Sequence, residues 1–279
     1  MKIGIGAFAA VAVVAAASVG IGRITFERRI AREVEALFAA SGTGARSVVT
    51  ETNLAGLPAP VQWWLRWSQV VGKERPATVR LRQEGRFRQA EDSAWVDFTA
   101  VEYYTTEPPG FVWKTTMRML PLVTITGRDR YADSRGSIDM RLLSLIPVAS
   151  VSGPALDQGA LLRYLNETMW FPAAVLSPYI TWEGIDANSA KATMSYGGVT
   201  AAATFIFDAE GRLVDMVAQR HDLSRGHLET WSTPIHAYGE FGGIRVPTEG
   251  VGQWRYDTGD FTYIEVRITE IEYNRSTPY

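Results

Sequence analysis

Histidine and acidic side chains are the residues of this chain that could support acid–base or metal chemistry. The three histidines are His221, His227 and His236, and their spacing matches none of the common zinc-binding patterns. His221 together with Asp222 and Glu229 offers an imidazole and two carboxylates, the composition of an acid–base or metal cluster. Spacing alone assigns neither a catalytic nor a metal-binding residue. A hydrolase that uses acidic residues and a histidine in a cleft therefore stands only as an alternative function.

Other catalytic and cofactor motifs give no positive signal. The chain has no Gly-x-Ser-x-Gly turn for a serine nucleophile. The sequence Gly4-Ile5-Gly6 lies inside an apolar segment with no strand before it, so it does not indicate a nucleotide-binding loop. The chain has no cysteine, which excludes disulfides, thiolate metal sites and cysteine nucleophiles. We therefore expect no cofactor, and nothing in the sequence favours an enzyme.

The acidic residue with the most unusual surroundings is Glu167. It lies among bulky apolar residues, where an unpaired carboxylate would be costly. Arg163 precedes it by four residues, so the two side chains share a helix face and are expected to form an ion pair. The helix that carries them is predicted to begin after Gly153-Pro154 and to end at Pro172. We interpret Glu167 as a polar contact inside a ligand-binding site.

Aromatic side chains provide the clearest positive signal. Eight of them are spread over many predicted strands and one predicted helix: Trp95, Phe98, Tyr104, Trp113, Trp170, Trp182, Trp231 and Trp254. If most face one side of a curved sheet, they are too bulky for a flat two-layer core and would line a deep pocket, as in sites for apolar ligands. The alternative is an aromatic-rich core that is fully packed, as in a structural or interaction module.

Residues 79–89 alternate between apolar and polar side chains, which predicts a β-strand. The polar face of this strand carries Arg80, Arg82, Arg86 and Arg88. We predict that these arginines meet an anionic headgroup at the rim of the ligand site. A solvated sheet face is the alternative explanation for the same stripe.

The elements that must position these residues are mainly antiparallel strands. Residues 177–273 read as one long meander, with turn signals such as Gly197-Gly198 and Gly242-Gly243 between short alternating runs. A first set of strands lies within residues 79–145. We expect an α+β fold, mostly antiparallel β, with one large curved sheet or half-open barrel of about ten strands and two or three covering helices.

The N-terminal segment 3–22 is uncharged and long enough to cross a bilayer as a helix of about 20 residues. It is expected to be an uncleaved membrane anchor or a signal peptide, and its length favours the anchor. Arg23, Arg28, Arg29 and Arg32 follow it, and the positive-inside rule then favours a cytoplasmic main domain. The expected organisation is an anchor or signal segment (1–22), an amphipathic helix and linker (23–56), and a single β-rich domain (57–279).

The overall charge bears on possible partners. The formal net charge is −2 and the isoelectric point is near 6.0, so the chain has no general attraction for nucleic acid. The expected partners are therefore a lipid or apolar small molecule and, through residues 3–22, a membrane. No feature identifies a protein partner.

Five runs of residues resemble a widespread, functionally uncharacterised family of bacterial conserved domains. They are residues 57–62, 80–87, 108–113, 167–172 and 240–247. The order of helices and strands also resembles the LolA-like lipoprotein-carrier half-barrel. That resemblance implies an open curved sheet whose helices enclose a lipid-binding cavity, and an extracytoplasmic main domain. The expected function is a membrane-anchored protein that holds a lipid or other amphiphile in an aromatic-lined cavity.

Overall fold

The structure is a computed structural model that describes the backbone of residues 2–42 and 47–279; the side chains of residues 2–12 and 15 are not described. The helices are α1 (Lys2–Ala40), α2 (Glu51–Leu54), α3 (Ala59–Trp67) and α4 (Pro154–Glu167), and the 3-10 turns Thr168–Trp170 and Pro172–Leu176 follow α4. The strands are β1 (Thr78–Phe87), β2 (Val96–Thr106), β3 (Pro109–Leu120), β4 (Val123–Ala132), β5 (Arg135–Leu142), β6 (Ile146–Ser152), β7 (Ile180–Gly184), β8 (Ser189–Tyr196), β9 (Val199–Phe207), β10 (Leu213–Asp222), β11 (His227–Ser232), β12 (Ile235–Phe241), β13 (Ile244–Tyr256) and β14 (Gly259–Tyr273).

All of these strands belong to one antiparallel sheet of 14 strands. Its order is β6-β5-β4-β3-β2-β1-β14-β13-β11-β10-β9-β8-β7, and β12 pairs with β13 beside this path. The mostly antiparallel, curved sheet is confirmed, but the expected count of about ten strands is too low. One missed strand is β6, an exposed run in which alternation between a buried and a solvated face is absent.

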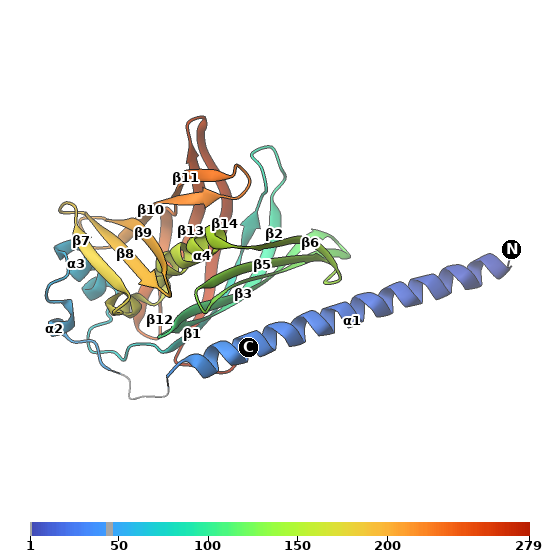
Figure 1. Ribbon diagram of the computed structural model, residues 1–279, viewed down its shortest axis with the longest axis horizontal. Coiled ribbons are helices and arrows are strands. Elements are labelled where there is room, and N and C mark those ends of the chain that lie inside the picture. The colour runs from blue at the N-terminus through green and yellow to red at the C-terminus, as the bar shows by residue number, and fades with distance from the viewer. Residues whose placement is uncertain (1, 43–46) are drawn as a thin grey trace.

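The connectivity explains why a helix lies inside the curve of this sheet. The first and last strands, β1 and β14, pair with each other in the middle of the sheet, with Val79 opposite Tyr273. The two ends of the sheet are then β6 and β7, which follow each other in the sequence with α4 between them. The chain must pass from one end of the curled sheet to the other, and α4 makes this crossing on the concave side (Figure 1).

Helix α4 is held closely against the sheet. The sheet has two halves, β1–β6 and β7–β14, and strands from both surround α4. The helix is therefore buried around most of its circumference, including Leu161, Leu162 and Leu165. At its N-terminus the backbone of β5 comes so close that a Cβ on Gly136 would lie 2.6 Å from the carbonyl oxygen of Leu156. Glycine is required there because no side chain fits this approach.

Helix α1 packs on the opposite, convex side. Its predicted apolar face, formed by Phe26, Ile30, Val34, Leu37 and Phe38, is buried against residues of β2, β3 and β4. The amphipathic helix is therefore confirmed, and its apolar face packs on the sheet. Ion pairs from Glu27 to Lys114 and from Glu33 to Arg128 border the contact, at 2.6 and 2.8 Å. The N-terminal half of α1 extends beyond the sheet (Figure 1).

A membrane-spanning helix was expected over residues 3–22. Among the residues described with their side chains, no helix is both long enough and apolar enough to cross a membrane. A large part of the expected segment, residues 3–12 and 15, lies outside these described side chains.

Candidate functional site

A cavity of about 470 Å³ lies between α4 and the concave face of the sheet. Strands from both halves contribute to its wall, including β1, β3, β4, β10, β11, β13 and β14. Its lining is dominated by apolar and aromatic side chains, among them Phe87, Trp113, Met140, Trp231, Tyr263 and Ile264. Native cores contain few voids larger than a water molecule. A space of this size is therefore a feature of the architecture and not a packing defect.

Five of the nine side chains predicted to bind a ligand line this cavity: Trp113, Glu167, Trp170, Trp231 and Trp254. The other four, Trp95, Phe98, Tyr104 and Trp182, are placed elsewhere.

Three of these four residues have aromatic or cationic neighbours of their own. Phe98 lies behind the cavity wall, with its ring 6.0 Å from that of Trp113. Trp182 packs against Phe205 in the distant part of the sheet, with ring centroids 5.0 Å apart. Trp95 lies in the β1–β2 hairpin, 4.7 Å from the guanidinium of Arg88.

The arginine stripe lies mainly on the face of β1 turned away from the cavity. The strand register places Arg80, Arg82 and Arg86 opposite Glu272, Glu270 and Glu265 of β14, at 2.6, 3.1 and 2.6 Å. These three arginines therefore form a cross-strand ladder of ion pairs, as a solvated sheet face does. Arg88, which follows the end of β1, does line the cavity, and it donates to the carbonyl oxygens of Thr262 and Glu91.

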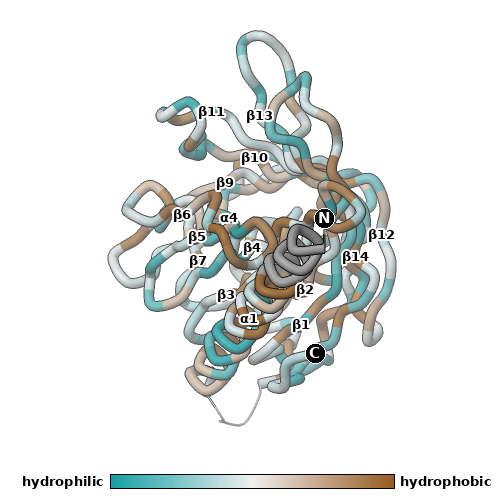
Figure 2. The backbone as a smooth tube through the Cα atoms, turned by 90° about the vertical axis from the view of Figure 1, so that its right-hand side faces the viewer, coloured by the Kyte–Doolittle hydropathy of each residue, from teal (hydrophilic) through white to brown (hydrophobic). Residues whose placement is uncertain are grey.

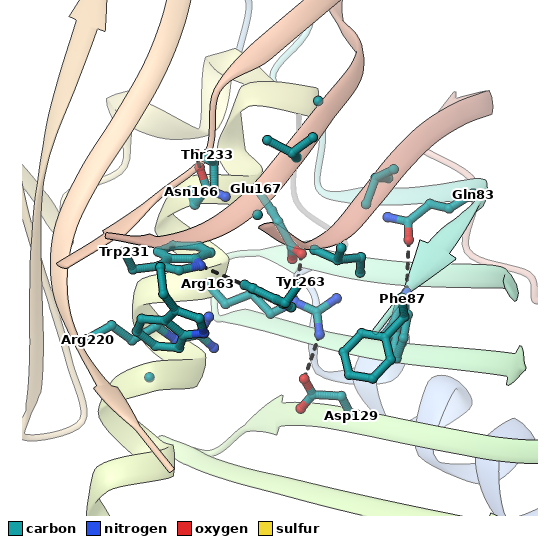
Figure 3. A pocket seen from close by; sticks show the side chains of 18 of the residues that line it. Gln83, Phe87, Asp129, Arg163, Asn166, Glu167, Arg220, Trp231, Thr233 and Tyr263 are labelled. Atoms are coloured by element: carbon teal, nitrogen blue, oxygen red, sulfur yellow. Dashed lines mark hydrogen bonds and ion pairs between the residues drawn. The ribbon is translucent and has the colours of Figure 1, made fainter. Parts of the chain in front are cut away.

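A buried polar cluster centred on Arg163 forms part of the wall. Its guanidinium donates to Glu167 Oε1 at 2.7 Å, to Glu102 Oε1 at 2.8 Å and to Asp129 Oδ2 at 2.5 Å. Figure 3 shows Arg163 pointing from α4 toward Asp129, with Glu167 beside it. The Arg163–Glu167 pair predicted from helical spacing is present. Glu102 and Asp129 were missed, because they come from β2 and β4 and nothing in the local sequence indicates that they converge.

The cluster connects to the aromatic lining through a short chain of hydrogen bonds. Tyr104 donates its hydroxyl to Glu167 Oε2 at 3.2 Å, which places this predicted ligand contact behind Glu167. Gln83 donates to Glu102 Oε2 at 3.1 Å and accepts from Trp113 Nε1 at 2.9 Å. The Trp113 ring is thus fixed in orientation by the same network that holds Arg163.

The charges in this cluster do not balance, since three carboxylates share one guanidinium. Burial raises the pKa of Glu102 well above its usual range, although Arg163 opposes the shift. Burial also raises the pKa of Glu167. Burial disfavours the charge on Arg163, but Glu102, Glu167 and Asp129 together raise its pKa well above the usual value. The arginine therefore stays charged, while Glu102 and Glu167 retain protons at a pH where exposed carboxyl groups have lost theirs.

A second cation, Arg220 of β10, lies in another part of the cavity wall. Its guanidinium is 4.6 Å from the centre of the Trp231 ring (Figure 3). No carboxylate of the described residues pairs with it. Gly159 of α4 faces it, and a Cβ there would lie 3.6 Å from Arg220 Nε. The cavity therefore combines an apolar body with a cation that forms no ion pair within the described part of the chain.

The histidine region does not assemble the acid–base cluster. His221 and Asp222 line the cavity, but Asp222 accepts hydrogen bonds from Tyr256 and Ser224. Both oxygens of Glu167 are occupied by Arg163 and Tyr104. Within the described residues, no group of three metal-binding side chains is present.

Comparisons with solved structures show similar but distant folds. A DUF1329 family protein from Desulfovibrio piger is 10% identical and has a TM-score of 0.42, with 77% of this chain and 92% of that chain covered. A LolA superfamily protein from Nitrosomonas europaea is 12% identical and has a TM-score of 0.35, with 73% and 88% covered. A comparison with the curated proteins gives no match.

The comparison with protein families identifies the chain. Residues 47–266 match DUF6544, which is described as a family of unknown function. This match includes all of α4 and the cavity-lining strands except the last residues of β14, from 267 on. The expected membership of an uncharacterised family is confirmed, and the chain belongs to the DUF6544 family.

Proposed function

We propose that this protein binds an amphiphile in the cavity between α4 and the sheet, with the apolar part of the ligand inside and an anionic group at Arg220. The single observation that carries the proposal is the aromatic-lined space of about 470 Å³ whose wall holds a guanidinium with no ion pair among the described residues. Ligand pockets commonly measure roughly 300–1,000 Å³. We also propose that residues 3–22 attach the chain to a membrane, because the segment is uncharged and about 20 residues long.

The lining favours a ligand with a hydrocarbon body. Each methylene group transferred from water to such a site contributes about 0.8 kcal/mol. Trp113 and Trp231 are rigid walls, because each indole nitrogen donates to a fixed partner, Gln83 and Tyr263. A preformed site loses little conformational entropy when the ligand binds.

An anionic group is favoured at Arg220 and not at Arg163. Arg163 is already shared by three carboxylates, whereas the guanidinium of Arg220 lies over the face of Trp231 and forms no ion pair among the described residues. A buried anion gains most from a cation that has no other counter-charge. Arg88, whose guanidinium donates to backbone carbonyls, is a second candidate contact.

Binding explains the site better than hydrolysis does. A general acid or base must be free to reach the substrate. Both oxygens of Glu167 already accept hydrogen bonds from protein side chains, and Asp222 is held by the tip of its own hairpin and by Tyr256. These acids act as structural anchors.

Two measurements on the full chain test the proposal. Native mass spectrometry after gentle purification is expected to show a bound mass of an amphiphile, and a fluorescent fatty acid is expected to bind to the delipidated protein. Gly159→Phe places a ring in the cavity and is expected to abolish probe binding. Gly159→Ala is the matched control, because its Cβ makes only ordinary contact with Arg220.

Two arginine variants test the place of the anionic group. Arg220→Met is expected to weaken binding of the fatty-acid probe about tenfold, or roughly 1.4 kcal/mol. Arg82→Met changes an arginine of the outer ladder and should leave the affinity unchanged. A wild-type protein that carries no bound mass and does not bind the probe would overturn the proposed function.

A further inference from the structure

Exposed apolar side chains gather on one side of the molecule. Of the fifteen large apolar side chains that are exposed in the described part of the chain, four lie on α1, three in the β3–β4 hairpin and three in the β5–β6 hairpin. Leu122, at the β3–β4 tip, is 89% exposed, and Leu120 is 62% exposed. Isolated exposed apolar residues are normal, but a group of this kind marks an interaction surface.

The β5–β6 tip and α1 form one continuous surface, and the β3–β4 tip lies beside them, because Leu143 N donates to the carbonyl oxygen of Thr124 at 2.8 Å. A Cβ on Gly22 of α1 would lie 3.1 Å from the carbonyl oxygen of Ser144 and 3.2 Å from Leu145 Cδ1, so the β5–β6 tip lies directly against the helix. Exposed Ile21 and Ile24 flank this contact, and Ile146 continues the surface into β6. Figure 2 views this side of the molecule, with α1 projecting toward the reader.

The β5–β6 tip is built at a conformational cost. Leu143 and Ser144 have φ angles of +53° and +59°, in the left-handed region that non-glycine residues rarely adopt. Asparagine and glycine are usual at such turns. The adjacent β6 is an edge strand whose Ile146 and Val148 are exposed, although natural edge strands are usually protected by charge. Both features are disadvantages for a surface that faces only water.

The charges around this surface are positive. Arg23, Arg28 and Arg118 are exposed, and no carboxylate of the described residues pairs with them. The nearby acids are neutralised, since Glu27 pairs with Lys114 and Asp139 pairs with Arg29 and Arg141. Unpaired arginines beside protruding apolar tips match the polar–apolar boundary of a membrane that contains anionic lipids.

We propose that the tips of the β3–β4 and β5–β6 hairpins, together with α1 around Gly22, dock on an anionic lipid bilayer. Peptides and helices usually bind in a groove. The tips protrude instead, so this surface is better suited to insertion between lipid headgroups. The inference does not depend on a ligand in the cavity. It also differs from anchoring by residues 3–22, because it assigns membrane contact to the folded sheet.

The absence of cysteine from the chain makes a site-specific test straightforward. Leu122→Cys and Ile146→Cys are labelled in the full chain with an environment-sensitive nitrobenzoxadiazole probe. Ile185→Cys, on an exposed residue just after β7, is the matched control. With phosphatidylcholine vesicles that contain phosphatidylglycerol, the two tip probes are expected to shift to shorter wavelength and to be quenched by nitroxide-labelled lipids. The control probe is expected to do neither.

Two outcomes would overturn the proposal. In the first, the protein floats with the vesicles while both tip probes remain in water, which would restrict membrane contact to α1. In the second, the tip probes shift without vesicles as protein concentration rises, which would make a second copy of the chain the occupant.

The charge component has its own test. Arg118→Gln is expected to weaken binding of the tips to the phosphatidylglycerol vesicles about fivefold and to leave binding to pure phosphatidylcholine unchanged. Lys191→Gln, which changes an exposed cation on β8, is the control. Equal effects of the two variants would contradict a specific basic rim.

Discussion

Arg163 is the residue that fixes α4 in register with the sheet. Its guanidinium joins Glu167 of the same helix to Glu102 of β2 and Asp129 of β4. The apolar contacts of α4 allow small shifts along the helix axis, whereas three directed ion pairs do not. Buried ion pairs often contribute little net stability because both partners lose hydration, but removal of one partner typically costs about 3–5 kcal/mol. We infer that the cluster serves mainly to position α4 and the cavity wall.

The raised pKa of Glu102 predicts how stability depends on pH. Burial favours the protonated carboxyl group in the folded state. The stabilisation linked to this proton is complete below the ordinary carboxyl pKa of 4.5, and it is lost as the pH rises through the raised value. Urea unfolding of the wild-type protein between pH 5 and pH 8 is expected to show a free energy of unfolding that falls with pH. Glu102→Gln is expected to reduce this dependence, because glutamine does not titrate, and the remainder belongs to Glu167, whose pKa burial also raises.

Asp208 does not contribute to this window, whereas Glu167, whose pKa burial also raises, contributes in the same direction as Glu102. Hydrogen bonds and charge from Arg212 lower the pKa of Asp208 in spite of burial, so the stability it contributes is lost only as the pH falls below its ordinary value of 3.8. Asp208→Asn is therefore a suitable control, with a pH slope from 5 to 8 like that of the wild type. If the free energy of unfolding of Glu102→Gln falls with pH as steeply as that of the wild type, a group other than Glu102 is responsible for the pH dependence.

At the scale of elements, the sequence indicated the type of most strands but not the face that turns inward. Alternation in β1 correctly separated Leu81 from the arginines, and Leu81 is fully buried. The same alternation could not show that Glu270 and Glu272 of β14 would lie opposite Arg82 and Arg80, because that register is set by residues almost two hundred positions apart. The arginines were therefore assigned to a ligand rim without knowledge of their partners.

The same limit applies to the cavity. Trp113, Trp231 and Trp254 were predicted as wall residues from their bulk and their spread over many strands, and they do line the cavity. Local patterns did not identify Arg220, whose importance depends on the absence of an ion pair to its guanidinium among the described residues. Sequence spacing reveals pairs within a helix, such as Arg163 with Glu167, but an unpaired charge becomes recognisable only in three dimensions.

The docking of α1 on the convex face gives a prediction about that element. Val34 is 1% exposed at the centre of the contact. Val34→Asp would bury an unpaired carboxylate, which costs several kcal/mol, so the helix is expected to detach from the sheet. Hydrogen exchange of the amides in residues 26–38 should then accelerate, while exchange in α4 stays slow. Ala36→Asp, on an exposed residue of the same helix, should change neither.

For the whole molecule, the topology makes the two halves of the sheet depend on each other. The strands β1–β6 form one half and β7–β14 the other, and they are joined by the β1–β14 pairing and by α4. One continuous hydrophobic core contains residues of both halves and of α3 and α4. The cavity lies where these parts meet, so its shape requires both halves to be folded.

This arrangement predicts cooperative unfolding of residues 47–279. Loss of either half would expose the apolar sides of α4, including Leu161 and Leu165, which contact the sheet from within. Far-ultraviolet circular dichroism and tryptophan fluorescence are expected to give the same urea midpoint. The slowest amides of β3 and β9, which lie in different halves, should exchange with the same free energy of opening. A clearly lower free energy of opening for β9 would mean that the half formed by β7–β14 opens alone. Release of a ligand from the cavity would then not require the half formed by β1–β6 to unfold.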